Sequence, residues 1–154
     1  SLIPWYEKQG FEKHNRGMWK KMILPEDKCR LRRNFRSVYG IEQISDIAPD
    51  FYWYNFDAFG DFRYYSTLNS RGEMVPCVFM TFYCEEPKPF TADVIFENVC
   101  NFEIGCKGVK TPLMGFDIMK VRSTDTLENM KYRICSLEDD DINFYCESFR
   151  IITV

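Results

Sequence analysis

Apolar and polar residues alternate along most of the chain from about residue 61 onward, which is the pattern of strands with one face toward a core. The run "DFRYYSTLN" is followed by the turn-like "SRGE" and then by "MVPCVFMTFYC", and together they predict a β-hairpin. The second run is apolar at both parities, which is typical of a strand covered on both faces.

Five further strands are predicted after residue 90, separated by short turns rich in Gly, Asn, Pro or acidic residues. Their sequences are "DVIFENV", "NFEIGC", "GFDIMKV", "KYRICSL" and "INFYCESFRIITV". In the last of them the apolar parity changes between Cys146 and Phe149, so we expect a bulge near Glu147 and Ser148. Connections this short favour antiparallel pairing.

The first 50 residues predict helices instead. "PEDKCRLRRNFRSVYG" begins with Pro25 and two acidic residues and ends at Gly40, as helices commonly do. One apolar stripe follows helical spacing: Leu31, Phe35, Val38 and Tyr39. Four arginines lie mostly off this stripe, which favours a solvated helix face over a nucleic-acid contact: Arg30, Arg32, Arg33 and Arg36. A second helix is expected upstream, around Trp5, Phe11, Trp19 and Met22.

We therefore expect a single domain over residues 1–154, partly helical over 1–50 and β-rich over 61–154. Its fold class is predicted as α+β, with one or two N-terminal helices packed on a mostly antiparallel β-sheet or sandwich.

Nine of the fifteen residues in "FYWYNFDAFGDFRYY", which begins at Phe51, are aromatic. Phe56, Phe59 and Phe62 recur every three residues, a spacing that suits an irregular segment packed into the core. A protein-binding surface, where Tyr and Trp are enriched, is the second interpretation. A base-stacking platform is the least favoured, because such platforms lie in basic grooves and the charges near these rings are mainly acidic.

Charge is unevenly distributed along the chain, whose formal net charge is −3. Residues 1–50 hold ten Lys or Arg and seven Asp or Glu, and the remainder holds ten and sixteen. The acidity of the larger part argues against binding to nucleic acid and favours a basic protein partner. We expect a cytoplasmic protein without membrane contact, because "SLIPWYEKQG" lacks a signal-peptide pattern and no apolar run reaches the ~20 residues that span a bilayer.

The residues offer little for catalysis, metal binding or cofactor binding. Seven cysteines without CxxC spacing are expected as buried thiols of a reduced compartment. His14 is the single histidine, so neither a zinc site nor a Ser–His or Cys–His arrangement has support. Asp57 and Asp61 could converge as an acid–base pair, but two carboxylates by themselves specify no reaction. We expect a protein that is not an enzyme and holds neither metal nor cofactor.

The acidic run in "SLEDDDINFYCESFR" is the remaining functional signal. Glu138, Asp139, Asp140 and Asp141 are expected in a hairpin turn, followed by a strand that carries Glu147. The run is either a solvated turn at a sheet end or a docking surface for a basic protein, where complementary charge speeds encounter. The region of Asp57 and Asp61 is the second candidate for such docking.

Three strand motifs carry a family resemblance: Phe96 with Val99, Phe102 with Ile104, and a final strand with Phe144, Cys146, Ser148 and Ile151. In these motifs residues 94–154 are similar to small bacterial immunity proteins that neutralise polymorphic toxins, such as those of contact-dependent growth inhibition. The group numbered fifty among the toxin-immunity families shows the most similar pattern.

This resemblance implies a cytoplasmic, non-catalytic protein that binds one cognate toxin domain and blocks its active site. Many such toxins are nucleases with basic clefts, so an acidic inhibitor would take the place of nucleic-acid phosphate. The alternative is a small-ligand-binding β domain, in which Tyr52, Trp53, Phe56 and Phe59 would wall an apolar cavity of ~300–1,000 Å³.

Overall fold

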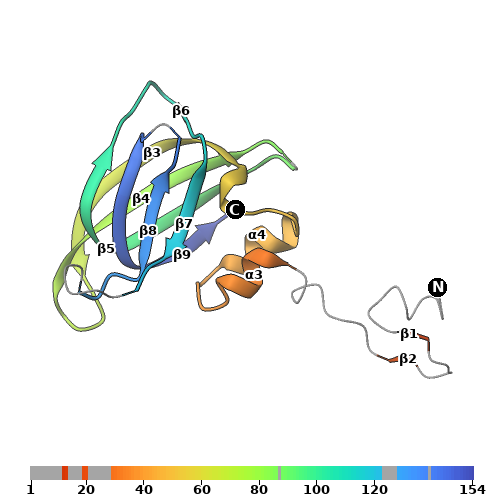
Figure 1. The fold of residues 1–154 in the computed structure, drawn as a ribbon. Helices are drawn as coiled ribbons and strands as arrows, with labels where there is room; N and C mark the ends of the chain where they lie inside the picture. The colour runs from red at the N-terminus through yellow and green to blue at the C-terminus, as the bar shows by residue number, and fades with distance from the viewer. Residues whose placement is uncertain (1–11, 14–18, 21–28, 87, 123–127, 139) are drawn as a thin grey trace.

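The fold, seen in a computed structural model, is mainly β (Figure 1). The structure describes residues 12–13, 19–20, 29–86, 88–122, 128–138 and 140–154. In chain order its elements are β1 (Glu12–Lys13), β2 (Trp19–Lys20), α3 (Arg30–Asn34), α4 (Ile41–Ile47), the 3₁₀ turn η1 (Trp53–Asn55), β3 (Phe56–Leu68), β4 (Met74–Cys84), β5 (Phe90–Ile104), β6 (Thr111–Pro112), β7 (Phe116–Lys120), β8 (Tyr132–Ser136) and β9 (Ile142–Thr153).

Seven strands form one sheet in the order β6-β3-β4-β5-β9-β8-β7, and every pairing is antiparallel, as expected. The sheet curls into a half-barrel (Figure 1). Its two outermost strands, β6 and β7, are joined by only Leu113, Met114 and Gly115. A link this short keeps the ends of the two strands at most about 14 Å apart. The two edges of the sheet therefore come together at this end of the half-barrel.

The predicted hairpin is confirmed as β3 and β4, with Leu68 opposite Met74 next to the turn. Asn69 organises that turn, because its side-chain oxygen accepts hydrogen bonds from the backbone N–H groups of Arg71 and Glu73, each at 2.9 Å. Along β4 the even-numbered residues from 78 to 84 are buried, whereas those numbered 79, 81 and 83 are half-buried. The strand is thus fully covered on one face, where the sequence predicted cover on both.

β5 is one bent strand where the sequence predicted two, and it pairs with β9 along most of its length. Glu97 lies opposite Ser148 and Val99 lies opposite Cys146, so the ladder keeps its register there and the expected bulge is not formed. Instead, both strands change their buried parity together. Asn98, with φ 56°, allows this paired bend because Asn tolerates the left-handed region better than most residues.

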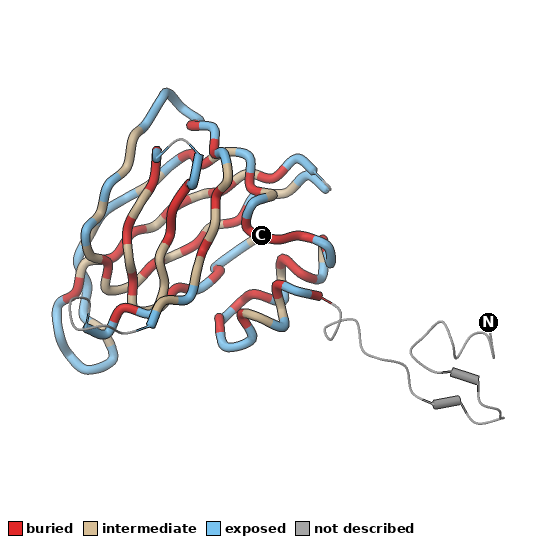
Figure 2. The backbone as a smooth tube through the Cα atoms, viewed as in Figure 1, coloured by how far each residue is buried: buried red, intermediate tan, exposed pale blue. Residues whose placement is uncertain are grey.

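Buried residues lie along the strands of the half-barrel (Figure 2), and the core that they form is mainly aromatic and aliphatic. Phe51, Trp53, Phe56 and Phe59 are each at most 1% exposed, and Phe62 is half-buried against the same core. The interpretation of the aromatic stretch as core packing is therefore confirmed for these residues, but Phe56, Phe59 and Phe62 lie in strand β3 and not in an irregular segment. Two rings of the stretch are instead exposed: Tyr54 and Tyr64.

The predicted α+β class is wrong, because the N-terminal helices are too short to form a layer on the sheet. α3 has five residues and α4 has seven. The helix expected between Pro25 and Gly40 ends at Asn34, and its residues 25–28 lie outside the described part of the chain. Its arginines are spaced three and four residues apart, where like charges repel one another and weaken a helix.

Gly40, expected to end the long helix, is instead the N-cap of α4 in a left-handed conformation, with φ 85°. Of the predicted apolar stripe, Leu31, Phe35 and Val38 are buried, whereas Tyr39 is 72% exposed. The turn after Asn34 explains the difference, since it breaks the helical periodicity before Tyr39.

The remaining N-terminal expectations concern residues that the structure largely leaves undescribed. Trp5, Phe11, His14 and Met22 lie outside the described residues. Trp19 belongs to β2, which pairs with β1 in a short antiparallel ladder, so the upstream helix is not formed at residues 12–13 and 19–20.

Candidate functional site

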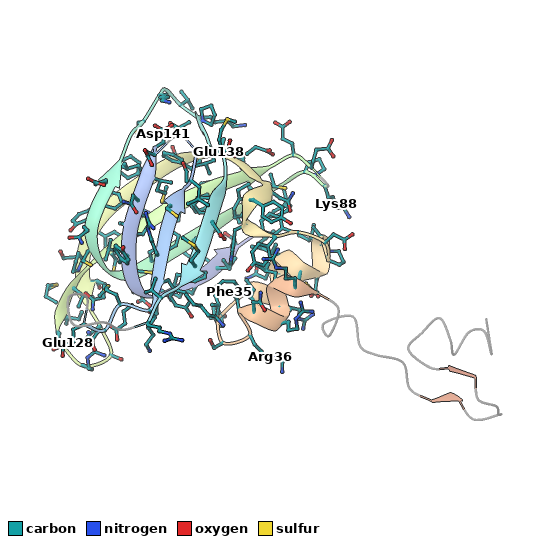
Figure 3. All side chains as sticks on the ribbon, viewed as in Figure 1. Phe35, Arg36, Lys88, Glu128, Glu138 and Asp141 are labelled. Atoms are coloured by element: carbon teal, nitrogen blue, oxygen red, sulfur yellow. The ribbon has the colours of Figure 1, made fainter. Side chains whose placement is uncertain are left out.

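Three segments meet where the two edges of the half-barrel come together: the start of β3, the β6–β7 link and the β8–β9 turn. The backbone N–H of Leu113 donates to the carbonyl of Asp57 at 2.8 Å, and that of Leu137 donates to the carbonyl of Gly115 at 3.0 Å. Figure 3 shows Glu138 at this end of the sheet, close to Asp141. We call the exposed residues of the three segments the rim: Asp57, Met114, Leu137, Glu138 and Asp140.

Backbone conformation brings the β6–β7 link and the β8–β9 turn into contact. Gly115 has φ 71°, and a Cβ atom added there would lie 3.2 Å from Cγ of Glu138, a tight contact. The N–H of Glu138 also donates to the carbonyl of Met114 at 3.3 Å. On the other side of the turn Asp140 has φ 55°, a conformation that Asp adopts more readily than most residues. The rim is thus held by backbone contacts, and its side chains are exposed to solvent.

The rim combines exposed apolar side chains with exposed carboxylates. Met114 is 52% exposed and Leu137 is 60% exposed, and the three rim acids, Asp57, Glu138 and Asp140, are exposed as well. Apolar groups surrounded by polar ones are typical of surfaces that bind other proteins, where the apolar part supplies affinity and the charges supply orientation.

The four consecutive acids of the sequence do not all belong to this surface. Asp141 is only 8% exposed, and its carboxylate forms an ion pair with Nζ of Lys107 at 3.0 Å. Its carbonyl accepts a hydrogen bond from the N–H of Gly105 at 2.7 Å. Asp141 therefore ties the loop after β5 to the β8–β9 turn. Asp139 lies outside the described residues.

Asp57 and Asp61 lie on β3 without converging. The carboxylate of Asp57 accepts a hydrogen bond from the N–H of Glu85 at 2.6 Å, which anchors the end of β4. Asp61 is exposed four residues further along the strand, a distance of about 13 Å for extended backbone. The structure therefore does not bring the two carboxylates together as an acid–base pair, and only Asp57 belongs to the rim.

Glu147 lies six residues beyond Asp141 along β9, about 20 Å from the rim. Its carboxylate accepts two hydrogen bonds from the Arg71 guanidinium, each at 3.2 Å, and one from Nδ2 of Asn98 at 2.9 Å. These bonds from Arg71 and then Asn98 hold the pKa of Glu147 below its ordinary value. Glu147 thus connects the β3–β4 turn to the bend of β5 and β9, apart from the other acids.

The four rings proposed to wall a ligand cavity are all buried in the core. Tyr52 also lines a hollow of about 320 Å³ beside β7. Trp53 contacts Phe56 and Phe51 through ring centroids 6.3 and 6.1 Å apart, which leaves the rings packed on one another. The aromatic cavity of the alternative hypothesis is therefore not formed by these residues.

The described residues hold no group of three or more His, Cys, Asp or Glu side chains placed to bind a metal ion. All seven cysteines carry free thiols. Burial raises the pKa of Cys84 to about 11 and also raises that of Cys146, which disfavours the nucleophilic thiolate at neutral pH. Among the described helices none has the length and apolar character that a membrane span requires.

Sequence reasoning identified the acidic half of the rim and missed its apolar half. Leu137 and Met114 look like ordinary strand-end residues in the sequence. The signal that could have found them is their position next to Gly115 and the acidic turn, since residues beside turns are often exposed.

Comparison of the chain with protein-family models, with curated proteins and with solved structures finds no match.

Proposed function

We propose that the protein is a non-catalytic immunity protein, which binds a cognate toxin domain through the rim and neutralises it by blocking its active site. The single observation that carries the proposal is the rim itself, where exposed Met114 and Leu137 stand among exposed carboxylates. The resemblance of residues 94–154 to toxin-immunity proteins adds support, because four of the five rim residues lie within that part of the chain.

A toxin with a nuclease active site is the partner class that the charge of the rim favours. Nuclease clefts present Lys and Arg to nucleic-acid phosphates, and carboxylates complement the same groups. Asp57, Glu138 and Asp140 would approach the basic cleft, while Met114 and Leu137 would be buried against its apolar border. The small-ligand alternative has less support, because all four of its proposed cavity rings are packed in the core.

The test uses the purified protein and the toxin domain encoded beside it. The first variant is Glu138→Lys with Asp140→Lys, and the second is Met114→Ser with Leu137→Ser. We expect the charge variant to associate about tenfold more slowly at low salt and to lose most of the salt dependence of that rate. The apolar variant should dissociate about tenfold faster, since buried apolar contacts act mainly on the dissociation rate. The apolar variant should keep the Tm of the parent, and the charge variant should be slightly less stable but folded, because Lys adopts the left-handed conformation of Asp140 less readily than Asp.

Glu128→Lys is the matched control, since Figure 3 shows Glu128 at the opposite end of the sheet from Glu138. It reverses an exposed charge away from the rim and should leave binding unchanged. If both rim variants are folded and bind like the parent, or if the control weakens binding as much as they do, the rim is not the docking surface. A complex that forms without inhibiting the toxin's activity contradicts the neutralising role alone.

A further inference from the structure

The second half of strand β3 forms an open edge of the sheet. β6 pairs with β3 only at Ala58 and Phe59, and no other strand in the described part of the chain pairs with the side of β3 that faces away from β4. Tyr64 is 53% exposed, Leu68 is 62% exposed, and Ser66 between them is exposed as well. The β3–β4 hairpin that carries this edge extends to the end of the sheet opposite β6 (Figure 1). The open edge is therefore separate from the rim.

The pairing of β3 with β4 determines which backbone groups face this edge. At the turn the N–H of Asn69 donates to the carbonyl of Glu73 at 2.9 Å, and the register continues from there without a shift as far as residue 62. Hydrogen-bonded and non-hydrogen-bonded pairs alternate along an antiparallel ladder, so the odd-numbered residues 63–69 bond to β4. Pro76, which has no N–H, lies opposite Ser66 and agrees with this assignment. The N–H and C=O groups of three residues therefore point away from β4: Tyr64, Ser66 and Leu68.

The side chains beside this edge are uncharged, and the largest are apolar or aromatic. Leu68 lies opposite Met74, which is 65% exposed on the same face, and the ring centroid of Tyr64 lies 5.4 Å from that of Phe102. From Tyr64 to Asn69 the sequence reads "YYSTLN", without a charge, a proline or a glycine. Edge strands usually carry Lys, Pro or a bulge that prevents pairing with another chain. A short uncharged segment of high β-propensity without these features is the type that pairs with copies of itself.

We propose that β3 pairs with β3 of a second copy of the chain, antiparallel about a two-fold axis at Ser66, so that the two sheets join edge to edge. In this register Ser66 lies opposite Ser66 of the second copy, and Tyr64 lies opposite Leu68. Each pair therefore joins residues whose N–H and C=O groups point outward, and the two residues of a pair exchange both hydrogen bonds. Each Tyr64 ring also packs beside a Leu68 side chain, a favourable cross-strand pair. A two-fold contact is closed, so association ends at the dimer.

Charge and burial favour this register over its neighbours. An axis at Arg63 would place two guanidinium groups directly opposite each other, which destabilises a strand pair. An axis at Tyr64 or Tyr65 would bring Phe62 into the contact, although Phe62 is half-buried and packs against Phe102. With the axis at Ser66, Arg63 lies opposite Asn69, and Phe62 lies beyond the paired residues.

Sedimentation velocity and amide hydrogen exchange of the purified chain test the pairing. An edge contact this short belongs to the weak class of interfaces, so the concentrations should reach about 0.5 mM. We expect a monomer at low concentration and a dimer at high concentration. The amides of Tyr64, Ser66 and Leu68 should exchange more slowly as the dimer forms, whereas those of Tyr65 and Thr67, which bond to β4, should not change. A monomer throughout, a species larger than the dimer, or edge amides whose exchange is independent of concentration overturns the proposal.

Charges placed at the axis test the register. Ser66→Lys and Ser66→Asp each put like charges opposite each other, so each variant alone should dimerise at least about tenfold more weakly than the parent. An equimolar mixture of the two should regain the dimer, because opposite charges then meet at the axis. Thr91→Lys adds the same charge at an exposed position of β5 and should dimerise like the parent.

The Tm of each variant checks that it is folded. The proposal is overturned if folded Ser66→Lys dimerises like the parent, if the mixture stays monomeric, or if Thr91→Lys weakens the dimer as much as Ser66→Lys does. Neither the rim nor a toxin enters these measurements, so they test the dimer independently of the proposed function.

Discussion

At the residue scale, Gly40 shows how one position depends on its non-local neighbours. It links α3 to α4 where the chain crosses β9, and the N–H of Ile151 donates to the carbonyl of Tyr39 at 2.8 Å beside it. Its φ of 85° lies in the left-handed region. A Cβ atom added to Gly40 would overlap the carbonyl oxygen of Ile151. Gly72 has a similar φ, 79°, but an added Cβ would meet no atom within 4 Å.

We predict that Gly40→Ala destabilises the fold much more than Gly72→Ala. Both variants bear the cost of a left-handed alanine, about 1–2 kcal/mol, and only Gly40→Ala adds a steric clash with the β9 backbone, about 1–3 kcal/mol more. Urea unfolding of the two variants and the parent measures the difference. Equal losses of unfolding free energy in the two variants would show that the α3–α4 linker moves away from β9 at no cost.

At the element scale, the bend shared by β5 and β9 changes the buried face of both strands in the middle of the sheet. Asn98 adopts the left-handed conformation at the bend and donates to Glu147 on the neighbouring strand at 2.9 Å. Arg71, from the β3–β4 turn, binds the same carboxylate through two nitrogens. A single carboxylate therefore connects three parts of the sheet.

The lowered pKa of Glu147 predicts how this connection responds to pH. A carboxyl group whose pKa falls on folding stabilises the fold fully above its unfolded pKa, about 4.5, and this contribution is lost as the pH falls through the folded value. The parent should therefore be more stable than Glu147→Gln at pH 7, with a difference that shrinks toward pH 3. The effect is modest and decreases with salt, because the pair is partly exposed.

Chemical denaturation at several pH values tests this prediction, with Arg71→Gln as the matched variant. Arg71 is the main cause of the lowered pKa of Glu147. The stability difference between Arg71→Gln and Glu147→Gln should therefore change less with pH than the difference between the parent and Glu147→Gln. A difference between the parent and Glu147→Gln that stays constant from pH 7 to 3 would contradict the assigned role of the carboxylate.

At the scale of the whole molecule, three aromatic rings connect strands that are far apart in the order of the sheet, β7 on one side and β3 and β4 on the other. The centroid of Phe82 lies 5.0 Å from those of both Phe56 and Phe116, and Phe56 and Phe116 are 6.1 Å apart. These residues come from β4, β3 and β7. The contact therefore joins β7, the last strand of the sheet order, to β3 and β4 near the other end, next to the short covalent link between β6 and β7.

We predict that Phe116→Ala lowers the free energy of unfolding by about 3–5 kcal/mol, the usual cost of removing a buried phenylalanine ring. Phe62→Ala should cost clearly less, because Phe62 is only half-buried. Guanidinium unfolding gives both values. If Phe116→Ala costs no more than Phe62→Ala, the two ends of the sheet are held by the backbone link and not by the ring contacts.

The sequence alone was sufficient for the features that depend on near neighbours. Alternation of apolar residues predicted the strands, the short connections predicted antiparallel pairing, and the turn residues placed the β3–β4 hairpin and the β8–β9 turn. The spacing of Phe56 and Phe59 predicted their burial. Each of these predictions rests on the spacing of apolar side chains along the chain or on the conformational preference of a few adjacent residues, both of which are local properties.

Tertiary structure decided the features that depend on residues distant in the chain. The rim exists because the curl of the sheet brings residue 57 beside residue 113, and residues 114 and 115 beside residues 137 and 138. The acidic run itself is divided by a contact with Lys107, which buries Asp141 and leaves Glu138 and Asp140 exposed. The apolar residues of the arginine-rich segment, Leu31, Phe35 and Val38, pack into the same core as the sheet. These outcomes depend on which surfaces pack against each other in the folded protein, and a local sequence pattern does not specify those tertiary contacts.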